Sequence, residues 1–343
     1  MASETETKSK GDLNSLLICP VCGEHDASVW REAFDDRYGH PDLFKIVRCQ
    51  DCSHLMTVPM PSEDDLADLY GTFYPRKNIT TNQIITQADK AGLAFSKIRR
   101  WWMGEDNHGQ YYSSPGEKML DVGCGSGLSL LEARKLGVDA WGIEADPNVK
   151  KFADELGLRI HQGSLHDNPF QEIIFDLIVL NQVIEHIPGP ERAMKIIQSR
   201  LSKNGRVILV FPNVNSLWCK ISGKRWINWH IPYHLHHFNK MTFSQMVERC
   251  GYKIIRTRTI TPNIWTIMQI RASKQSIQRG QPNPIWKVNV TDGSSSPKTS
   301  HRNFIKQIFL SSVLVAIAIV NRIVDSFGFG DSLMVEVKLK KSL

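Results

Sequence analysis

Short apolar stretches and longer stretches of mixed polarity alternate between residues 116 and 252, and this pattern predicts alternating strands and helices. The apolar stretches are Met119–Val122, Val138–Glu144, Leu158–Gln162, Phe175–Leu180 and Gly205–Phe211. Helical patterns occupy Asn148–Leu156 and Glu191–Ser202, and a further helix begins at Leu128. A regular alternation of this kind is typical of an α/β fold.

The first predicted strand runs directly into a turn with three glycines, Gly123, Gly125 and Gly127. Glycine lets the backbone turn sharply and approach a ligand closely, because it has no Cβ. The helix that follows offers unpaired N–H groups and the positive end of its dipole. The G-x-G-x-G spacing differs from the G-x-G-x-x-G and Gly-Lys-Ser/Thr patterns of phosphate-binding loops. The turn therefore predicts a nucleotide-like ligand at the carboxyl end of a parallel sheet.

An acid, Glu144, ends the next predicted strand, where a carboxylate can accept hydrogen bonds from two ribose hydroxyls. With this acid, the turn and the order of elements, residues 116–252 closely resemble the class I S-adenosylmethionine-dependent methyltransferases, in particular the ubiquinone-biosynthesis-like branch. The resemblance implies a Rossmann-like sheet with helices on both faces and S-adenosylmethionine as the cofactor. A redox dinucleotide enzyme on a similar sheet is the alternative.

The resemblance also implies which residues contact the cofactor. They are Asp121, Gly123, Cys124, Gly125, Gly127, Glu144, Ser164, Leu165, Asn181 and Gln182. The turn would hold the methionine part of the cofactor, Glu144 the ribose, and Ser164 with Leu165 the adenine. Asn181 and Gln182 would line the methyl-transfer face. Family members usually carry an acid at the position of Ser164, so Asp167 is a substitute contact to the adenine.

Composition and charge are typical of a globular protein and do not identify a binding partner. Its 343 residues suffice for two or three domains, and 41% of them are apolar. A net charge of +7 permits an anionic partner but does not require one. Met1–Ser15 is polar, with neither a basic start nor an apolar stretch, so we expect a disordered tail rather than a secretory signal.

Four of the seven cysteines form two C-x-x-C pairs, Cys19 with Cys22 and Cys49 with Cys52. Four thiolates satisfy tetrahedral Zn²⁺ and leave no open position for water, so we expect a structural zinc site in a module over residues 16–60. Because the four cysteines fill the coordination shell of the zinc ion, we expect His25, His40 and His54 on the surface. Cysteines in such pairs, without a signal sequence, favour a reducing compartment, and we expect a cytoplasmic protein.

This region is similar to the zinc-binding amino-terminal modules of many bacterial methyltransferases, some of which act on sugars. Ser62 then predicts the N-cap of a helix, the first element of a connector over residues 61–115. A second helix is predicted over Ala88–Met103. Its Trp101 and Trp102 lie beside basic residues and could stack on an anionic acceptor, but packing against the neighbouring domain is favoured.

Histidines mark where the methyl acceptor should bind. His186 follows the fourth strand within a Glu-His pair that the family places at the active-site edge, and its role is either general base or loop anchor. Residues 226–238 combine four histidines with four aromatic residues, which suits a sugar or ring acceptor. We predict His234 and His237 as acceptor-side residues. A metal site at these histidines is less favoured, because no nearby Asp or Glu joins them.

The strands Tyr252–Ile260 and Leu333–Leu339 would complete the sheet of a methyltransferase domain over residues 116–343, with an insertion over about 261–330. Residues 273–302 are rich in Ser, Pro, Gln, Gly and Asn and predict a mobile lid or linker. Ile308–Val320 is uncharged and, as a helix of ~20 Å, is too short for a ~30 Å bilayer core. A buried helix is favoured over an in-plane membrane contact through residues 302–324 on the inner face of the membrane.

These patterns predict transfer of a methyl group from S-adenosylmethionine to a hydroxyl, or less readily a carbon, of a small-molecule or saccharide acceptor, which could be lipid-linked. Asn181-Gln182-Val183-Ile184 replaces the Asn/Asp-Pro-Pro-aromatic motif of enzymes that methylate amines of bases or amides, and this disfavours such substrates. Two alternatives stay open. One is a ribosomal RNA methyltransferase whose zinc module grips RNA, and the other is a non-catalytic binding protein that keeps the cofactor fold.

Overall fold

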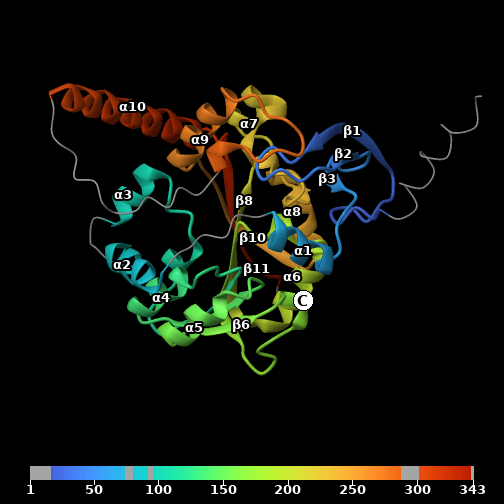
Figure 1. The fold of residues 1–343 in the computed structure, drawn as a ribbon. Helices are drawn as coiled ribbons and strands as arrows, with labels where there is room; N and C mark the ends of the chain where they lie inside the picture. The colour runs from blue at the N-terminus through green and yellow to red at the C-terminus, as the bar shows by residue number, and fades with distance from the viewer. Residues whose placement is uncertain (1–16, 74–79, 92–95, 287–300, 341–343) are drawn as a thin grey trace, which may run out of the picture.

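A seven-stranded sheet runs through the middle of the molecule (Figure 1). The computed structural model describes residues 17–73, 80–91, 96–286 and 301–340. The strand order is β10-β11-β8-β7-β4-β5-β6. The strands are β4 (Lys118–Val122), β5 (Asp139–Glu144), β6 (Arg159–Gln162), β7 (Phe175–Asn181), β8 (Leu201–Pro212), β10 (Tyr252–Ile260) and β11 (Ser332–Leu339). Only β11 runs against its neighbours, β8 and β10. The predicted α/β fold is confirmed.

Helices cover both faces of this sheet, which explains why its central strands are mostly apolar. The helices are α4 (Leu128–Lys135), α5 (Val149–Leu156), α6 (Pro190–Arg200) and α8 (Lys240–Arg249). In Figure 1, α4 and α5 lie on one side of the sheet and α6 and α8 on the other. Ile178 and Leu180 of β7 and Leu209 of β8 are completely buried between the two layers.

A smaller antiparallel sheet in the order β1-β2-β3-β9 joins the amino-terminal module to the large domain. Its first three strands are β1 (Ala27–Phe34), β2 (Leu43–Cys49) and β3 (Leu55–Val58). The fourth, β9 (His236–His237), comes from the histidine-rich stretch far along the chain. The module predicted over residues 16–60 therefore shares its sheet with the large domain and does not stand apart from it.

The described part of the connector contains three α-helices. As predicted, Ser62 caps α1 (Glu63–Thr72), in a capping box with Asp65. In place of one helix over Ala88–Met103, the structure has α2 (Thr81–Ala91) and α3 (Ser96–Met103), with residues 92–95 outside the described part. Trp102 is half-buried, whereas Trp101 is 46% exposed, so the prediction that both tryptophans pack is wrong for Trp101.

The described part of the insertion between β10 and β11 contains two α-helices, α9 (Asn263–Ser273) and α10 (His301–Ser326). About half of the predicted lid or linker over residues 273–302, namely residues 287–300, lies outside the described residues. The prediction that Ile308–Val320 is buried holds for Ala318 but is wrong for most of the described side chains, because Leu314, Val315, Ile319 and Val320 are 41–51% exposed. Among the described residues, the structure contains no helix that is long and apolar enough to cross a membrane.

Candidate active site

The glycine turn lies directly after β4, at the carboxyl edge of the sheet. Gly123, Gly125 and Gly127 all have positive φ angles, of 74°, 55° and 81°, which explains why this turn requires glycine. A Cβ on Gly123 would lie 2.5 Å from a methyl carbon of Val183. A Cβ on Gly125 would meet no atom within 4 Å. The turn is therefore packed on one side and open at Gly125, where a ligand can approach the backbone.

Two carboxylates flank the turn. Glu144, at the end of β5, accepts a hydrogen bond of 2.7 Å from the backbone N–H of Gly125. Asp121, in β4, is buried and accepts a hydrogen bond from the hydroxyl of Ser129. Burial raises the pKa of Asp121 to about 7. Both acids thus lie next to the glycine turn. Glu144 lies at its open side, and Asp121 is buried below it.

The predicted adenine contacts lie in the next turn along the edge, around the short helix η2 (Leu165–Asp167). The carboxylate of Asp167 folds back and accepts a hydrogen bond of 2.7 Å from the backbone N–H of Ser164. Leu165 is buried in the core. An acid therefore lies beside Ser164, and its contact with an adenine stays a prediction. Cys124 is buried too, and its sulfur lies so near Gly142 that a Cβ there would be 2.6 Å from it, so Cys124 packs in the core.

Asn181 ends β7 beside the turn, and Gln182 follows it. The side-chain oxygen of Asn181 is buried and has no hydrogen-bond partner within the described part of the chain. Gln182 has a positive φ of 59°, and its backbone N–H donates to the carbonyl of Val210 over 2.7 Å. A buried amide oxygen without a partner is costly, so a ligand that donates a hydrogen bond to Asn181 fits this position.

His186 and His234 come together at the same edge, with ring centroids 4.6 Å apart. Nδ1 of His186 is 2.9 Å from both the carbonyl oxygen of Tyr233 and the hydroxyl of Tyr70. Nδ1 of His234 is 2.8 Å from the carbonyl oxygen of Asn228. Because a carbonyl only accepts, each ring carries its proton on Nδ1 and leaves Nε2 as an acceptor. Burial lowers the pKa of His186 to about 4, so the ring is neutral near pH 7.

Glu185 is the main site residue that sequence reasoning missed. Its side chain is 1% exposed, and neither carboxylate oxygen has a hydrogen-bond partner among the described residues. Burial raises its pKa to about 8, and Oε1 lies 3.9 Å from Nε2 of His186. The expectation that no acid accompanies the histidines is therefore wrong, since Glu185 comes from a distant segment. One donor atom each from Glu185, His186 and His234 lie within 4.8 Å of one another, a set that can share a proton or hold a divalent ion.

Comparison with known proteins identifies the family of the segment that contains this edge of the sheet. Residues 109–257 match the family model described as "Methyltransferase domain". This segment of the chain is a methyltransferase domain. Within it lie the glycine turn, both carboxylates and the Glu185–His186 pair.

Individual relatives and one solved structure are similar to parts of this chain. A ubiquinone biosynthesis O-methyltransferase from Actinobacillus pleuropneumoniae is 28% identical over 36% of this chain and 59% of its own. A ribosomal protein L11 methyltransferase from Thermosipho africanus is 36% identical over 29% of this chain and 38% of its own. A TehB-like SAM-dependent methyltransferase from Corynebacterium glutamicum superposes over 76% of this chain and 98% of its own, with 18% identity and a TM-score of 0.38. The chain spans less than two thirds of the length of these two curated relatives.

His237, also predicted on the acceptor side, has a different environment from His186 and His234. It lies in β9 with 3% of its surface exposed, and its Nε2 is 3.0 Å from the hydroxyl of Thr57 in β3. Its neighbour His236 contacts Nε2 of His54 over 3.3 Å. The prediction of a surface position is correct for His25 and wrong for His54, which is fully buried. These histidines join the amino-terminal module to the methyltransferase domain.

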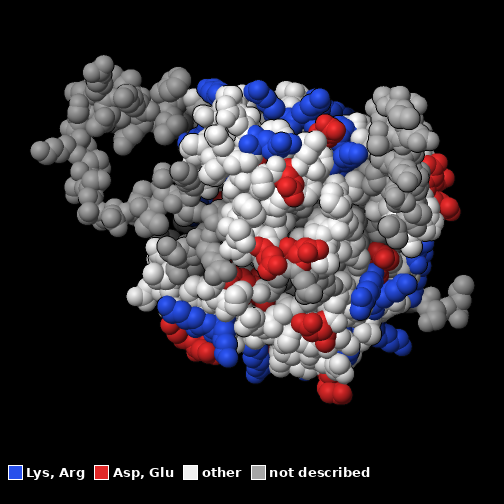
Figure 2. All heavy atoms as spheres, turned by 45° about the vertical axis from the view of Figure 1, so that its right-hand side comes forward, with Lys and Arg blue, Asp and Glu red and all other residues white. Residues whose placement is uncertain are grey.

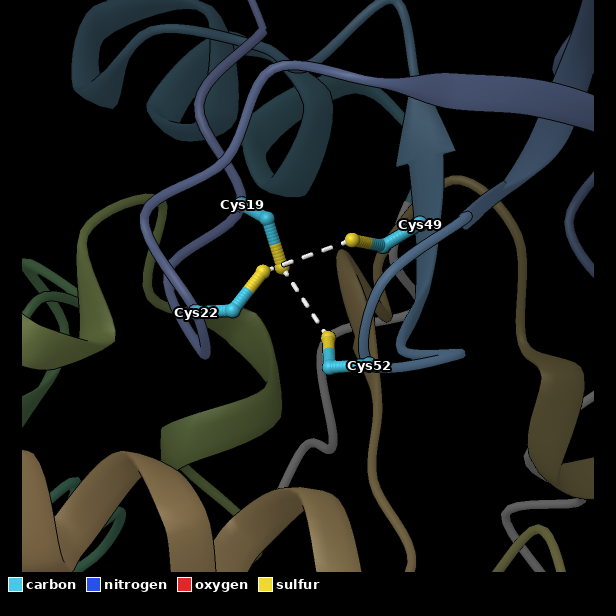
Figure 3. Close-up of side chains that lie close together, drawn as sticks. All are labelled: Cys19, Cys22, Cys49 and Cys52. Carbon is cyan, nitrogen blue, oxygen red and sulfur yellow. Dashed lines mark hydrogen bonds between the residues drawn. The ribbon is translucent and has the colours of Figure 1, made fainter.

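The four cysteines of the module converge, as predicted (Figure 3). Sulfur atoms of Cys19 and Cys52 are 3.5 Å apart, and those of Cys22 and Cys49 are 3.4 Å apart. A tetrahedral ion with ~2.3 Å bonds to sulfur requires sulfur–sulfur distances of ~3.8 Å. The arrangement therefore fits a zinc ion with little adjustment, and four thiolates this close need a cation to balance their charge.

Proposed function

We propose that the protein transfers a methyl group from S-adenosylmethionine to a hydroxyl group of a small-molecule or saccharide acceptor. The observation that carries the proposal is the shared edge: the open glycine turn and the neutral His186 both lie at the carboxyl end of the same sheet. A hydroxyl must lose its proton as it attacks the methyl group, and a neutral imidazole can take it. The O-methyltransferase name of one relative fits an oxygen acceptor.

In this proposal, the turn from Gly123 to Gly127 holds the methionine part of the cofactor and Glu144 binds its ribose hydroxyls. Glu144 supports the assignment, because its carboxylate already accepts a hydrogen bond from the turn. The adenine lies beside Leu165, with Ser164 or Asp167 near its amine. Asn181 and Gln182 lie next to the reacting methyl group, where the unpartnered amide oxygen of Asn181 can accept a hydrogen bond.

Methyl transfer is an in-line displacement, so the protein mainly aligns the acceptor oxygen, the methyl carbon and the sulfonium sulfur. The new oxygen–carbon bond forms as the carbon–sulfur bond breaks, and the sulfur keeps the electron pair. The acceptor proton passes to Nε2 of His186, whose ring is oriented by the carbonyl of Tyr233 and the hydroxyl of Tyr70. Glu185 and His234 lie next to this nitrogen and can carry the proton onward.

We further propose that Cys19, Cys22, Cys49 and Cys52 hold a structural zinc ion. The sulfur distances support this, and a closed set of four thiolates leaves the ion no catalytic position. Its role would be to shape the acceptor side, because β3 follows Cys52 by three residues and pairs with β9.

A transfer assay tests the proposed function. The full chain is mixed with methyl-labelled S-adenosylmethionine and a host-cell extract, which is then separated into water-soluble, organic, RNA and protein fractions. We expect label in the water-soluble or organic fraction, and none with a Glu144→Ala variant. Label in RNA or protein would replace the proposed acceptor class, and no label in any fraction would favour a non-catalytic binding protein.

A further inference from the structure

The described part of α10 and the loop that follows it expose an apolar surface. Its side chains, which we call the apolar face, are 37–73% exposed and comprise Val313, Leu314, Val315, Ile319, Val320, Ile323, Phe327 and Phe329. No charged residue occurs between positions 307 and 321. Contiguous apolar surfaces of this kind mark protein or membrane contacts, because leaving them in water is unfavourable.

The carboxyl-terminal end of α10 is firmly attached to the rest of the insertion. Asn321 donates to the side-chain oxygen of Asn263 over 3.0 Å and accepts from the hydroxyl of Thr266 over 3.1 Å. Arg322 forms a buried ion pair of 2.8 Å with Asp325. The apolar face is thus presented by an anchored helix and is not a frayed end of the chain.

Basic side chains lie near the place where α10 is attached to α9. Six exposed residues, which we call the basic rim, lie on or next to α7 (Leu217–Ser222) and α9: Lys220, Lys224, Arg225, Arg271, Lys274 and Arg279. Residues 213–235 and 261–286 contain no Asp or Glu. Arg225 donates to the carbonyl of Ser273 over 2.9 Å, and the ammonium of Lys220 lies 4.9 Å from the ring of Phe329. The rim and the apolar face are therefore adjacent.

Figure 2 shows Lys and Arg gathered along the top of the molecule, the end at which Figure 1 shows α7 and α9. We propose that the apolar face and the basic rim bind together to the surface of an anionic lipid bilayer. Apolar side chains of an in-plane helix enter the head-group boundary, while Lys and Arg beside them attract anionic head groups. A second copy of the chain fits less well, since a two-fold contact on this surface would bring two basic rims together.

Vesicle co-sedimentation with the full chain tests this proposal. We expect it to pellet with vesicles of equal parts phosphatidylglycerol and phosphatidylcholine, less so as salt is raised, and to stay in solution with phosphatidylcholine alone. A Val315→Asp/Val320→Asp variant should bind about tenfold more weakly. Lys220→Glu/Lys224→Glu/Arg271→Glu should also weaken binding and reduce its salt dependence.

Matched controls separate this contact from general effects. Ile174→Asp changes an apolar residue of similar exposure, 47%, and Lys150→Glu/Lys151→Glu reverses exposed charges on α5, so both should bind as the unchanged protein does. Unchanged melting temperatures would show that all variants are folded. Vesicle binding that is absent, or unaffected by Val315→Asp/Val320→Asp, overturns the proposal. So does a stable dimer that the same variant converts to monomers, because a second copy would then cover the apolar face.

Discussion

At the scale of single residues, the site depends on side chains whose burial changes their chemistry. His186 is neutral because its surroundings disfavour the charged ring, and Glu185 is protonated near pH 7 for the same reason. Gly125, by contrast, is important because the space beside it is open to a ligand.

Gly125→Ala should weaken S-adenosylmethionine binding by about tenfold or more, because the new methyl group would enter the space proposed for the cofactor. Gly116→Ala is the matched control, since Gly116 also has a positive φ, of 84°, and open space around it, but lies before β4. Both variants should lose about 1 kcal/mol of stability from backbone strain. Calorimetric titration measures the binding, and equal affinity of the two variants would contradict the assigned turn.

His186→Ala should lower the rate of methyl transfer about 100-fold to 10,000-fold while leaving cofactor affinity unchanged, because it removes the proposed base and not a cofactor contact. The rate of the unchanged protein should fall only below about pH 5, as the ring becomes protonated at its lowered pKa of about 4. His25→Ala, at an exposed position, is the control. A rate that survives His186→Ala with its pH profile intact would leave His186 as a loop anchor only.

At the scale of elements, the pairing of β3 with β9 connects the cysteine module to the acceptor side. Leu55 and Met56 of β3 lie opposite His237 and His236 of β9. The backbone N–H of Leu235, just before β9, donates to the carbonyl of Glu185 over 2.8 Å. A short chain of backbone contacts thus runs from the cysteines to the residues proposed to handle the acceptor proton.

Removal of zinc should therefore impair the acceptor side more than the cofactor side. Cys49→Ser/Cys52→Ser should abolish zinc binding and most methyl transfer, while the affinity for S-adenosylmethionine stays within about threefold, because the glycine turn lies on the large sheet. Cys250→Ser, a buried cysteine outside the cluster, is the control. Zinc content, calorimetry and label transfer measure the three effects. Loss of cofactor binding together with zinc would show that the module supports the whole fold.

At the scale of the whole molecule, buried carboxyl groups make stability depend on pH. Burial raises the pKa of Glu185 to about 8, and those of Asp121 and Asp331 to about 7. In the unfolded chain such groups have pKa values near 4. Between these values the folded state holds protons that the unfolded state has lost, so the free energy of unfolding falls as pH rises through this window.

We expect Glu185→Gln to flatten this dependence, because glutamine has no proton to lose. Between about pH 6.5 and 8.5 the fall in unfolding free energy should shrink by about 1–2 kcal/mol. Buried histidines with lowered pKa values add a contribution of the opposite sign near pH 6.5, because their rings gain protons only in the unfolded chain. This contribution is common to both proteins and cancels when their slopes are compared. Chemical denaturation at several pH values measures the slope, with Glu172→Gln as an exposed control. A slope equal to that of the unchanged protein would show that Glu185 is ionised or compensated in the fold.

The sequence by itself determined the elements and contacts whose signals are local. The strands from Met119 to Phe211, the glycine turn, the cap at Ser62 and the paired cysteines all depend on neighbours a few residues away, and each was found as predicted. Glu144 ends β5 as predicted, whereas the roles of Glu144 and Asp167 toward the cofactor stay predictions. Local signals suffice here because dihedral preferences and short-range hydrogen bonds decide these structures.

Only the tertiary structure decided which distant residues meet and what each helix buries. The cluster of Glu185, His186 and His234 and the contact of Tyr70 with His186 unite segments with no shared local pattern. His54 is buried because β9 and Phe238 cover it. The apolar run in α10 is compatible with a helix buried in the protein or exposed on its surface. Hydrophobicity favours the removal of these side chains from water but does not specify what covers them. Which surface covers such a helix depends on the path of the whole chain.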